Sequence, residues 1–573
     1  MPEDLLLAIR KFALKNAFDY GKCDPKAIVG KVIGEFPESR KNFADLMAKI
    51  TNAAVQVNSM PKEEIEKELS TFHFEEKKPE ERKLPDLKGA ENGKVVMRMA
   101  PNPNGPMHIG HCRMAVLNDE YTKRYSGTLI LRFDDTDPKN ENKIPMKEAY
   151  AWMPEDMRWL GVNFHRIERA SARLQVYYVY CKKALEGGFA FVCTCKQEGW
   201  SESVRHEKKE CPCKKNSPEK NLELWNKMLS WELKQGEAVV RVKTDVNEKN
   251  PAVVDWPAFR IIDAPEHPMV GKEFKVWPML DFASAIDDFE FKVTHILRGK
   301  DLLVSQERQK ILYKYFGWTY PNVTLYGKFL TTDDMVISKS KINAGIREGR
   351  FSGFDDPQLS TMKALRRRGI LPQAIRNYML NIGISESETT VDLNILYAEN
   401  KKLLETSTEH YFFVENPIVL KVRGLQVKNL EIPKHPTNKE LGSRRVHFDD
   451  EFLISGKDAG EIRLEEVIRL KELANVKIYK QENGKLFGEY AGNDLIKTSK
   501  KLHWVSAKFG EQVNSSILFV EKLTETGPLE KVEHKGVCEK ACSELKQGQV
   551  VQFERMGFCV LDSKDGMKFI LSC

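Results

Sequence analysis

Short apolar runs alternate with segments of helical periodicity through the middle of the chain. The run at 95–99 predicts a buried strand, the Pro/Asn/Gly cluster at 101–106 breaks it, and an apolar-periodic segment that begins near His108 predicts a helix. A second buried-type strand follows at 128–133, and the same pattern resumes between 277 and 298. Strands and helices that alternate in this way predict a doubly wound, parallel α/β sheet.

Other patterns flank this α/β region. Near the N-terminus Leu5, Ala8, Ile9 and Phe12 share one helical face, whereas the charged, proline-containing stretch after residue 76 is typical of a linker. These changes of pattern predict an N-terminal helical domain at 1–76, a linker at 77–92, a first α/β half at 93–189, an insert at 190–275, a second α/β half at 276–344, a helical and basic region at 345–418, and β-structure at 419–573.

The C-terminal part has the signature of an all-β region. Beyond residue 419, short β-type runs are separated by polar breaks. Such spacing predicts antiparallel β-barrels. The runs that support this prediction are 445–448, 476–479, 516–520, 550–553 and 558–561.

The composition narrows the class of protein. At 573 residues the chain is long enough for about four domains. Its net charge of +7 is compatible with an anionic polymer partner without requiring one. No apolar run approaches the ~18 residues of a membrane span, and the start does not resemble a signal peptide, so we expect a cytoplasmic protein without membrane contact. The 11 cysteines are then expected to be reduced, some as metal ligands.

The turn between the first strand and its helix is a candidate anion site. Free N–H groups and the helix dipole both favour phosphate at a helix N-terminus. His108 and His111 are three residues apart, so both rings lie on one face and can donate to phosphate oxygens. The alternative is a pair of solvated or core histidines beside an ordinary turn. The preceding Arg98 and the Pro-Asn-Pro-Asn-Gly loop argue against that alternative.

The stretch 101–111 resembles the HIGH motif of class I aminoacyl-tRNA synthetases. The resemblance implies that His108 and His111 are catalytic. It also implies an ATP site to which Gly105, Gly110 and these histidines belong.

A second stretch, 336–341, is similar to the KMSKS loop of the same class. Ser338, Lys339 and Ser340 match, while Val336 stands where the motif has its first lysine. The resemblance implies that all three matching residues bind ATP and that Lys339 neutralises β- and γ-phosphate charge as pyrophosphate leaves. A solvated basic loop is the alternative for this segment taken alone.

The same resemblance implies an amino-acid site for glutamate. Arg98 lies at the position that holds the substrate carboxylate, Asn102 lies in the loop that follows, and Asp134 lies where an acidic partner for the α-ammonium stands. Arg298 matches the arginine that receives the γ-carboxylate in glutamyl enzymes, where glutaminyl enzymes have a small uncharged residue. A guanidinium pairs with a carboxylate bidentately, whereas an amide would leave donors facing donors.

Two observations qualify this amino-acid site. Arg298 has a structural alternative, an ion pair with Asp281 or Asp287. In addition, Leu280 stands where the family usually has a substrate-contacting tyrosine. The function of that hydroxyl must be omitted or supplied by another residue.

Four cysteines in the insert form a Cys-x-Cys…Cys-x-Cys pattern. Two close pairs of thiolates joined by a loop can close tetrahedrally around zinc, and four cysteine ligands leave no open position for catalysis. The family also has a zinc-binding segment in this region. We therefore predict a structural Zn²⁺ site, with free thiols as the alternative, at Cys193, Cys195, Cys211 and Cys213. Cys538 and Cys542 are expected to be ordinary cysteines of the β-region.

A basic cluster lies in the helical region after the KMSKS-like loop and resembles the segment that contacts tRNA in the family. Consecutive arginines cover several helix faces, so some are expected to meet phosphate while others are only solvated. The cluster consists of Lys363, Arg366, Arg367, Arg368 and Arg376, of which the three consecutive arginines are our candidate tRNA-binding residues.

The resemblance covers nearly the whole chain and points to the archaeal-type glutamyl-tRNA synthetases. It implies a Rossmann-type catalytic domain split by an acceptor-binding insert, an N-terminal helical domain, and C-terminal antiparallel anticodon-binding β-barrels. It also implies use of ATP with Mg²⁺ and L-glutamate, and charging of tRNA(Glu). The sequence leaves open whether tRNA(Gln) is charged too. There are two alternatives, a glutaminyl enzyme and a non-catalytic tRNA-binding relative. Arg298 argues against the first. The second would have lost the residues that bind phosphate, and this chain keeps them.

Overall fold

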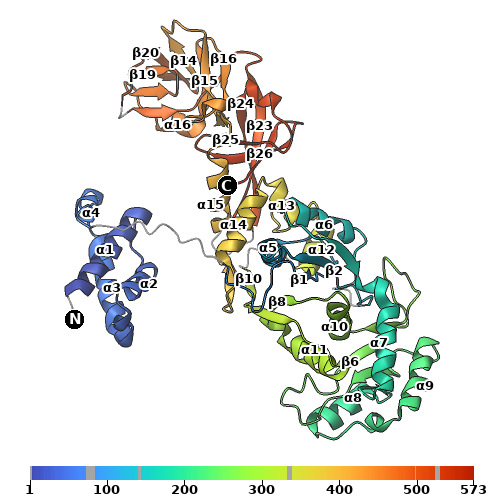
Figure 1. The fold of residues 1–573 in the computed structure, drawn as a ribbon. Helices are drawn as coiled ribbons and strands as arrows, with labels where there is room; N and C mark the ends of the chain where they lie inside the picture. The colour runs from blue at the N-terminus through green and yellow to red at the C-terminus, as the bar shows by residue number, and fades with distance from the viewer. Residues whose placement is uncertain (1–2, 73–83, 140–142, 332–337, 497–498, 523–528) are drawn as a thin grey trace. The chain divides into compact units, whose positions relative to one another are not determined.

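The chain folds into two units, 1–81 and 82–573 (Figure 1). The computed structural model describes residues 3–72, 84–139, 143–331, 338–496, 499–522 and 529–573. Within these ranges, no helix combines the length and the apolar character needed to cross a membrane.

The first unit is helical, as the N-terminal periodicity predicts. The Asp24 side chain accepts the N–H of Lys26 and so begins the second helix, where Pro25 occupies the first turn. Leu5 and Ile9 are buried in the core of this unit. Its helices are α1 (Glu3–Tyr20), α2 (Pro25–Glu35), α3 (Phe43–Asn58) and α4 (Lys62–Leu69).

Only part of the predicted linker is described by the structure. Residues 77–83 lie outside the described residues. Leu84 and Leu87 are buried and pack into the main core of the second unit. The segment 84–92 therefore belongs to that unit, because its two leucines are removed from water there.

A parallel sheet forms the centre of the second unit. Strands β1 (Val96–Met99), β2 (Thr128–Phe133) and β3 (Arg166–Arg169) pair in parallel, as do β8 (His295–Gly299) and β9 (Asn322–Tyr326). The Thr294 N–H donates to the Val96 carbonyl at 2.9 Å, which places β8 beside β1. The strands thus lie in the order β3-β2-β1-β8-β9, which confirms the predicted doubly wound sheet.

Helices connect these strands. Helix α5 begins directly after the turn that follows β1 and lies in the same core as α14. The helices of this part are α5 (Ile109–Arg124), α6 (Ala149–Trp159), α7 (Leu174–Glu186), α10 (Leu280–Glu290) and α11 (Leu303–Phe316).

The insert carries its own antiparallel sheet. Trp225 packs edge-on against Phe259, with ring centroids 5.2 Å apart, and Phe259 contacts Phe282 of α10 at 4.9 Å. This aromatic contact joins the insert to α10. The insert comprises β4 (Ala190–Cys193), α8 (Gln197–Trp200), α9 (Pro218–Leu229), β5 (Val239–Val242), β6 (Pro257–Ile261) and β7 (Val276–Pro278), so its sheet extends three residues past 275.

The region after the second α/β half is helical, as predicted. Its helices are α12 (Lys339–Arg347), α13 (Met362–Arg367), α14 (Pro372–Ile382) and α15 (Leu393–Leu404), and a short parallel pair joins β10 (Phe329–Thr331) to β11 (Thr389–Val391).

Two seven-stranded sheets, each curled into a barrel-like shape, form the C-terminal part. One contains β14 (Pro417–Arg423), β17 (Glu451–Ser455), β18 (Val467–Leu470), β19 (Ala474–Glu482), β20 (Lys485–Tyr490), β21 (Lys500–Leu502) and β22 (Val505–Ser506). The other contains β12 (His410–Tyr411), β13 (Phe413–Glu415), β23 (Gln512–Lys522), β24 (Leu529–Glu539), β25 (Val550–Phe553), β26 (Gly557–Ser563) and β27 (Lys568–Leu571). A hairpin of β15 (Asn429–Pro433) and β16 (Ser443–His447), and α16 (Gly456–Glu461), complete this part.

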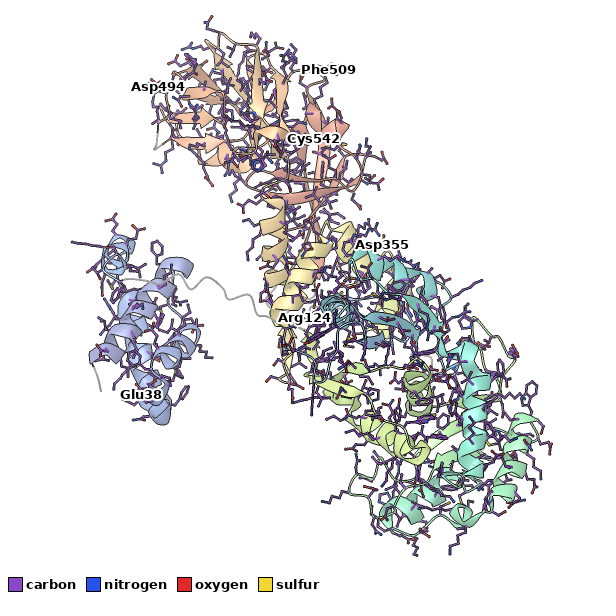
Figure 2. All side chains as sticks on the ribbon, viewed as in Figure 1. Glu38, Arg124, Asp355, Asp494, Phe509 and Cys542 are labelled. Carbon is purple, nitrogen blue, oxygen red and sulfur yellow. The ribbon has the colours of Figure 1, made fainter. Side chains whose placement is uncertain are left out.

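The pairing in these sheets is mostly antiparallel, with parallel pairs in each. Strand β14 pairs in parallel with β20, and β12 with β25. These pairs join strands far apart in sequence, which no hairpin connects. The five predicted β-runs fall on strands, except that Phe448 lies one residue past the end of β16. In Figure 2, Phe509 lies at the outside of this part and Cys542 within it; Cys538 and Cys542 are buried free thiols.

Candidate functional site

A cavity of about 400 Å³ opens at the carboxyl ends of β1 and β8. The chain order reverses between these two strands, which is where open α/β sheets bind ligands. The cavity brings together residues from the HIGH-like loop, from α10 and from α11. Among the residues that line it are Arg98, Asn102, Gly110, His111, Asp134, Leu280, Ser284, Arg298 and Gln309.

The two histidines of the HIGH-like loop form the N-terminal cap of α5. The Gly110 N–H donates to Nδ1 of His108 at 3.1 Å, and the His108 N–H donates to Nδ1 of His111 at 3.2 Å. Because both Nδ1 atoms accept hydrogen bonds, a neutral ring carries its proton on Nε2. Both rings are therefore Nε2–H donors. A Cβ at Gly110 would lie 2.9 Å from Cε1 of His108, so glycine is required there.

Burial keeps both rings neutral. It lowers the pKa of His111 to about 4. For His108, burial together with the neighbouring His111 ring holds the pKa well below its ordinary value. The pair can thus donate hydrogen bonds to phosphate without adding positive charge of its own.

This pair gives a pH-dependent prediction. We expect His111 to titrate near pH 4 in NMR of the ring nitrogens, with exposed His206 as the reference ring. Because the folded-state pKa is lowered, the stabilisation from this cap is fully present above about pH 6.5 and is lost as the pH falls through about 4. A His111 midpoint near pH 6.5 would contradict the proposed protonation state.

The arginines near the carboxyl ends of β1 and β2, Arg98 and Arg132, are paired with aspartates. Nε and Nη2 of Arg98 donate to the two carboxylate oxygens of Asp288 at 2.9 and 3.2 Å. Nη1 of Arg132 donates to Asp134 at 3.1 Å. Burial raises the pKa of Asp134, against the opposing effect of Arg132. Oδ1 of Asn102 is buried and has no hydrogen-bond partner within the described part of the chain, so a ligand donor would satisfy it.

Arg298 is buried and has a neutral partner. Its Nη2 donates to Oε1 of Gln309 at 2.7 Å, while Nη1 has no partner among the described residues. The alternative ion pair is not formed. Asp281 pairs with Arg308 at 2.6 Å, and Asp287 is held by Arg132 and Arg173. Burial lowers the pKa of Arg298.

The KMSKS-like segment is described only from Ser338 onward, and Val336 lies outside the described residues. Lys339 is the first residue of α12, and its Nζ donates to the Ile144 carbonyl at 3.3 Å. Burial lowers its pKa. The hydroxyls of Ser338 and Ser340 are 3.0 Å apart. None of these three residues lines the cavity as it stands.

Two contacts place this region beside the HIGH-like loop. Lys339 donates to Ile144, and two residues further on the Met146 N–H donates to the Pro103 carbonyl at 2.8 Å. The Ile109 N–H donates to the Ser360 carbonyl at 3.0 Å, and His108 forms an isolated antiparallel β-bridge with Thr361. Gly105 lies buried in the same loop. The two predicted ATP segments therefore approach each other in the fold.

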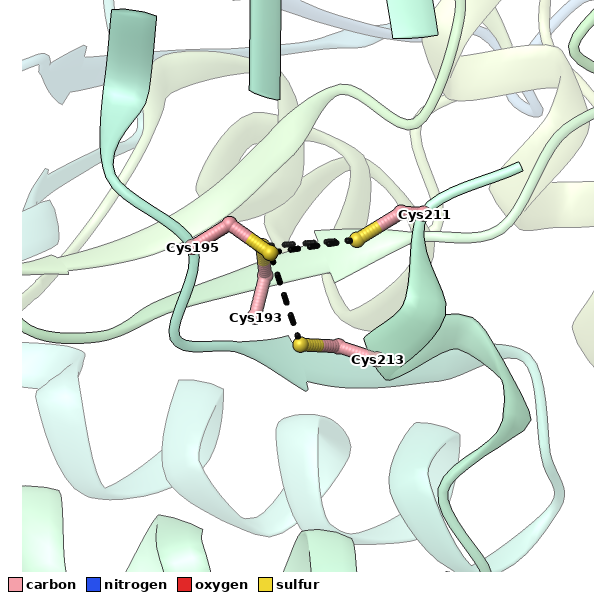
Figure 3. A group of neighbouring side chains, drawn as sticks. All are labelled: Cys193, Cys195, Cys211 and Cys213. Atoms are coloured by element: carbon pink, nitrogen blue, oxygen red, sulfur yellow. Dashed lines mark hydrogen bonds between the residues drawn. The ribbon is translucent and has the colours of Figure 1, made fainter. Parts of the chain in front are cut away.

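The four cysteines of the insert converge (Figure 3). The Sγ atoms of Cys193 and Cys211 are 3.7 Å apart, those of Cys195 and Cys211 3.9 Å, and those of Cys195 and Cys213 3.8 Å. A zinc ion with four sulfurs at about 2.3 Å requires sulfur separations of about 3.8 Å. These three separations match that value, and all four sulfurs lie within 4.8 Å of one another. The arrangement supports the sequence prediction.

The basic cluster is divided between surface and interior. Arg366 is exposed, with a long contact to Glu155 at 3.3 Å. Arg367 instead donates bidentately to Asp562 of β26 at 2.8 and 2.9 Å. Arg368 is buried and donates to the Tyr397 hydroxyl at 2.8 Å. The sequence predicted that arginines of this cluster that do not meet phosphate are merely solvated. That prediction is wrong for Arg367 and Arg368, because both hydrogen-bond to residues distant in sequence.

Lys363 and Arg376 complete this cluster. Nζ of Lys363 lies 3.6 Å from the centre of the Trp152 ring. Arg376 is buried against Asp119 and Glu120. Both contacts are internal to the chain.

Three residues of the site escaped the sequence reasoning: Asp288, Ser284 and Gln309. The adjacent pair Asp287–Asp288 on an apolar helix was a usable signal, because unpaired carboxylates are rarely buried. No local pattern distinguishes Gln309 or Ser284, since the hydrogen bond that joins them spans 25 residues of sequence.

Comparison with known proteins gives consistent matches along the chain. Residues 94–406 match the family described as tRNA synthetases class I (E and Q), catalytic domain, and 409–490 and 501–562 match its anti-codon binding domains. A glutamate–tRNA ligase of Thermococcus kodakarensis is 41% identical over 98% of this chain and 97% of its own length. One of Methanosarcina mazei is 40% identical over 99% and 98%. A crystal structure of a glutamate-tRNA synthetase from Elizabethkingia anophelis is 19% identical, with a TM-score of 0.39, over 55% of this chain and 71% of that one.

Proposed function

Because the chain belongs to the class I tRNA synthetases of the glutamate and glutamine group, we propose that it is a glutamate–tRNA ligase. The observation that carries the choice of glutamate is Arg298. This guanidinium is buried in the cavity without a carboxylate partner among the described residues. A buried cation needs a counter-charge, and the side-chain carboxylate of glutamate supplies one. Glutamine would leave that charge uncompensated.

We propose that the α-carboxylate of glutamate attacks the α-phosphorus of ATP in line. A C–O–P bond forms while the bond from that phosphorus to the pyrophosphate oxygen breaks. Arg98 and Asn102 orient the substrate, and Asp134 faces its ammonium. The Nε2–H groups of His108 and His111 donate to phosphate oxygens at the N-terminus of α5.

Gly105 and Gly110 let the backbone approach the nucleotide, and Ser338, Lys339 and Ser340 approach it from the other side. Lys339 offers its ammonium to the leaving pyrophosphate. Mg²⁺, which accompanies ATP in this class, neutralises further phosphate charge when bound. A terminal ribose hydroxyl of tRNA, implied by the family to be the 2′-hydroxyl, then takes the acyl group and releases AMP.

The proposed macromolecular partner is tRNA(Glu), with Arg366 as the member of the consecutive arginines that is free to meet phosphate. Neither the family match nor the names of the relatives support tRNA(Gln) as a second partner. A cytoplasmic place of action follows from the proposed role in translation.

The test is ATP–pyrophosphate exchange with glutamate or glutamine, each with and without tRNA. We expect exchange with glutamate and little with glutamine. Preferred exchange with glutamine would identify a glutaminyl enzyme. No exchange with either amino acid, in the presence of tRNA that the protein binds, would identify a non-catalytic relative.

We also propose that the four cysteines hold a structural Zn²⁺ ion. About one equivalent of zinc per chain should remain through gel filtration. Replacing both Cys193 and Cys211 should remove it and unfold the insert locally, because a structural metal supplies much of the folding energy of a small module. ATP binding at the HIGH-like loop should survive.

Elemental analysis and limited proteolysis of the insert measure these effects. Cys181→Ala, which removes a buried thiol outside the cluster, is the matched control and should keep its zinc. Protein purified without chelator and found free of zinc would overturn the metal assignment.

A further inference from the structure

Gln309 connects Arg298 to the frame of the cavity. We propose that Gln309 is a specificity-determining positioning residue: its amide oxygen fixes Arg298 without neutralising it, which reserves the guanidinium charge for the side-chain carboxylate of the substrate. This inference rests on the proposed glutamate–tRNA ligase function. It concerns how that function distinguishes glutamate from glutamine.

A chain of short hydrogen bonds fixes the Gln309 amide. Its Oε1 accepts from Nη2 of Arg298 and from the Tyr320 hydroxyl, both at 2.7 Å. Its Nε2 donates to Oγ of Ser284 at 2.6 Å. The Ser284 hydroxyl in turn donates to the Leu280 carbonyl at 2.7 Å. Every polar atom of the amide is thereby engaged.

The Ser284 hydroxyl decides which way the amide points. It has one proton, and that proton is used on the Leu280 carbonyl, so it can only accept from Gln309. The amide nitrogen must therefore face Ser284, and the amide oxygen must face Arg298. Gln309 is 2% exposed and Ser284 is 4% exposed, so water does not compete for these positions.

The charge around Arg298 differs from that around its neighbours. Arg98 pairs with Asp288, and Arg308 pairs with Asp281. Arg298 instead meets the neutral oxygen of Gln309 and keeps its full charge. Its Nη1 is shielded from solvent and has no partner among the described residues. A buried donor of this kind is satisfied when a ligand supplies the acceptor.

Glutamate at position 309 would have nearly the same shape and the opposite consequence. Its carboxylate would accept the same Arg298 hydrogen bond more strongly, because the bond becomes charge-assisted. The guanidinium would then be neutralised from inside the protein. The cavity would lose its preference for a substrate carboxylate over a substrate amide.

The experiment compares Gln309→Glu with the parent in ATP–pyrophosphate exchange, using glutamate and glutamine in the presence of tRNA. We expect kcat/KM for glutamate to fall at least about 30-fold, chiefly through KM, because a buried charge pair with the substrate is lost. The ratio of kcat/KM values for glutamate and glutamine should fall with it. The KM for ATP should stay within about twofold of the parent, because none of the proposed ATP-binding residues belongs to this hydrogen-bond chain.

Two further variants keep the test decisive if Gln309→Glu folds poorly. Ser284→Ala removes the acceptor that orients the amide and should raise the KM for glutamate while kcat changes less. Tyr313→Phe is the matched control, because it removes a buried hydroxyl of α11 that donates to the Ala285 carbonyl and lies outside the hydrogen-bond chain of Gln309. We expect it to leave the glutamate-to-glutamine ratio unchanged.

The outcomes separate this inference from the proposed function. A parent protein that does not activate glutamate would overturn the function itself. A parent that activates glutamate, with folded Gln309→Glu and Ser284→Ala variants that keep the parental ratio and KM, would overturn only the role of Gln309.

Discussion

Lys339→Ala is expected to lower the rate of adenylate formation by about two to three powers of ten, because a single donor that acts on transition-state charge typically contributes that much. The ammonium lies at the start of α12, half-buried and in contact with the Ile144 carbonyl beside the HIGH-like loop. From this position the ammonium can stabilise the negative charge that develops on the leaving pyrophosphate. Affinity for tRNA should be nearly unchanged.

Single-turnover formation of glutamyl-adenylate measures this effect directly. Lys341→Ala is the matched control, because Lys341 lies two residues away on the same helix and is exposed. The control should react within about twofold of the parent. Activation at a near-normal rate by Lys339→Ala would remove this lysine from the mechanism.

Arg298→Ala is expected to lower kcat/KM for glutamate by more than two orders of magnitude. Removing one partner of a buried charge pair typically costs about 3–5 kcal/mol, and the γ-carboxylate would enter the cavity without its counter-charge. Much of the loss should appear as a higher KM. Arg298→Lys should rescue only partly, because a point charge cannot reproduce the planar fork that Gln309 holds in place.

Steady-state exchange kinetics with glutamate and glutamine provide the measurement, with the KM for ATP as the internal control. Glutamine use should rise little, because the substitution adds no partner for an amide and the apolar Leu280 cannot hydrogen-bond one. If Arg298→Ala charges tRNA with glutamate as efficiently as the parent, the arginine is structural. The choice of glutamate would then lose its main physical support.

Local sequence was enough to predict most of the elements in this chain. The periodicity around His108 predicted the strand, turn and helix that the structure contains at β1 and α5, because caps and periodicity act within one or two turns. The same holds for the β-runs at 516–520 and 558–561. Strand pairing was less accessible. The parallel pair of β12 with β25 joins segments more than a hundred residues apart, where no local signal exists.

For the candidate site, too, some features could be predicted from the sequence and others depend on the tertiary structure. The sequence supplied the candidate residues for the proposed chemistry: the two histidines, Arg98, Arg298 and the four cysteines. The tertiary structure decided the state of each one. Burial and the α5 cap make the histidines neutral donors, and packing brings the four sulfurs to tetrahedral spacing.

The sequence by itself determined which charges this protein carries at its site, whereas only the tertiary structure decided how each of them is compensated. Arg98 and Arg298 look alike in sequence, yet the first is paired with the carboxylate of Asp288 and the second donates to the neutral amide oxygen of Gln309. The partner of Arg98 lies 190 residues away. Arg366 and Arg367 differ in the same way: Arg367 pairs with the distant Asp562, whereas Arg366 lies at the surface. The physical reason is that pairing and desolvation depend on distance in space, which local sequence does not encode.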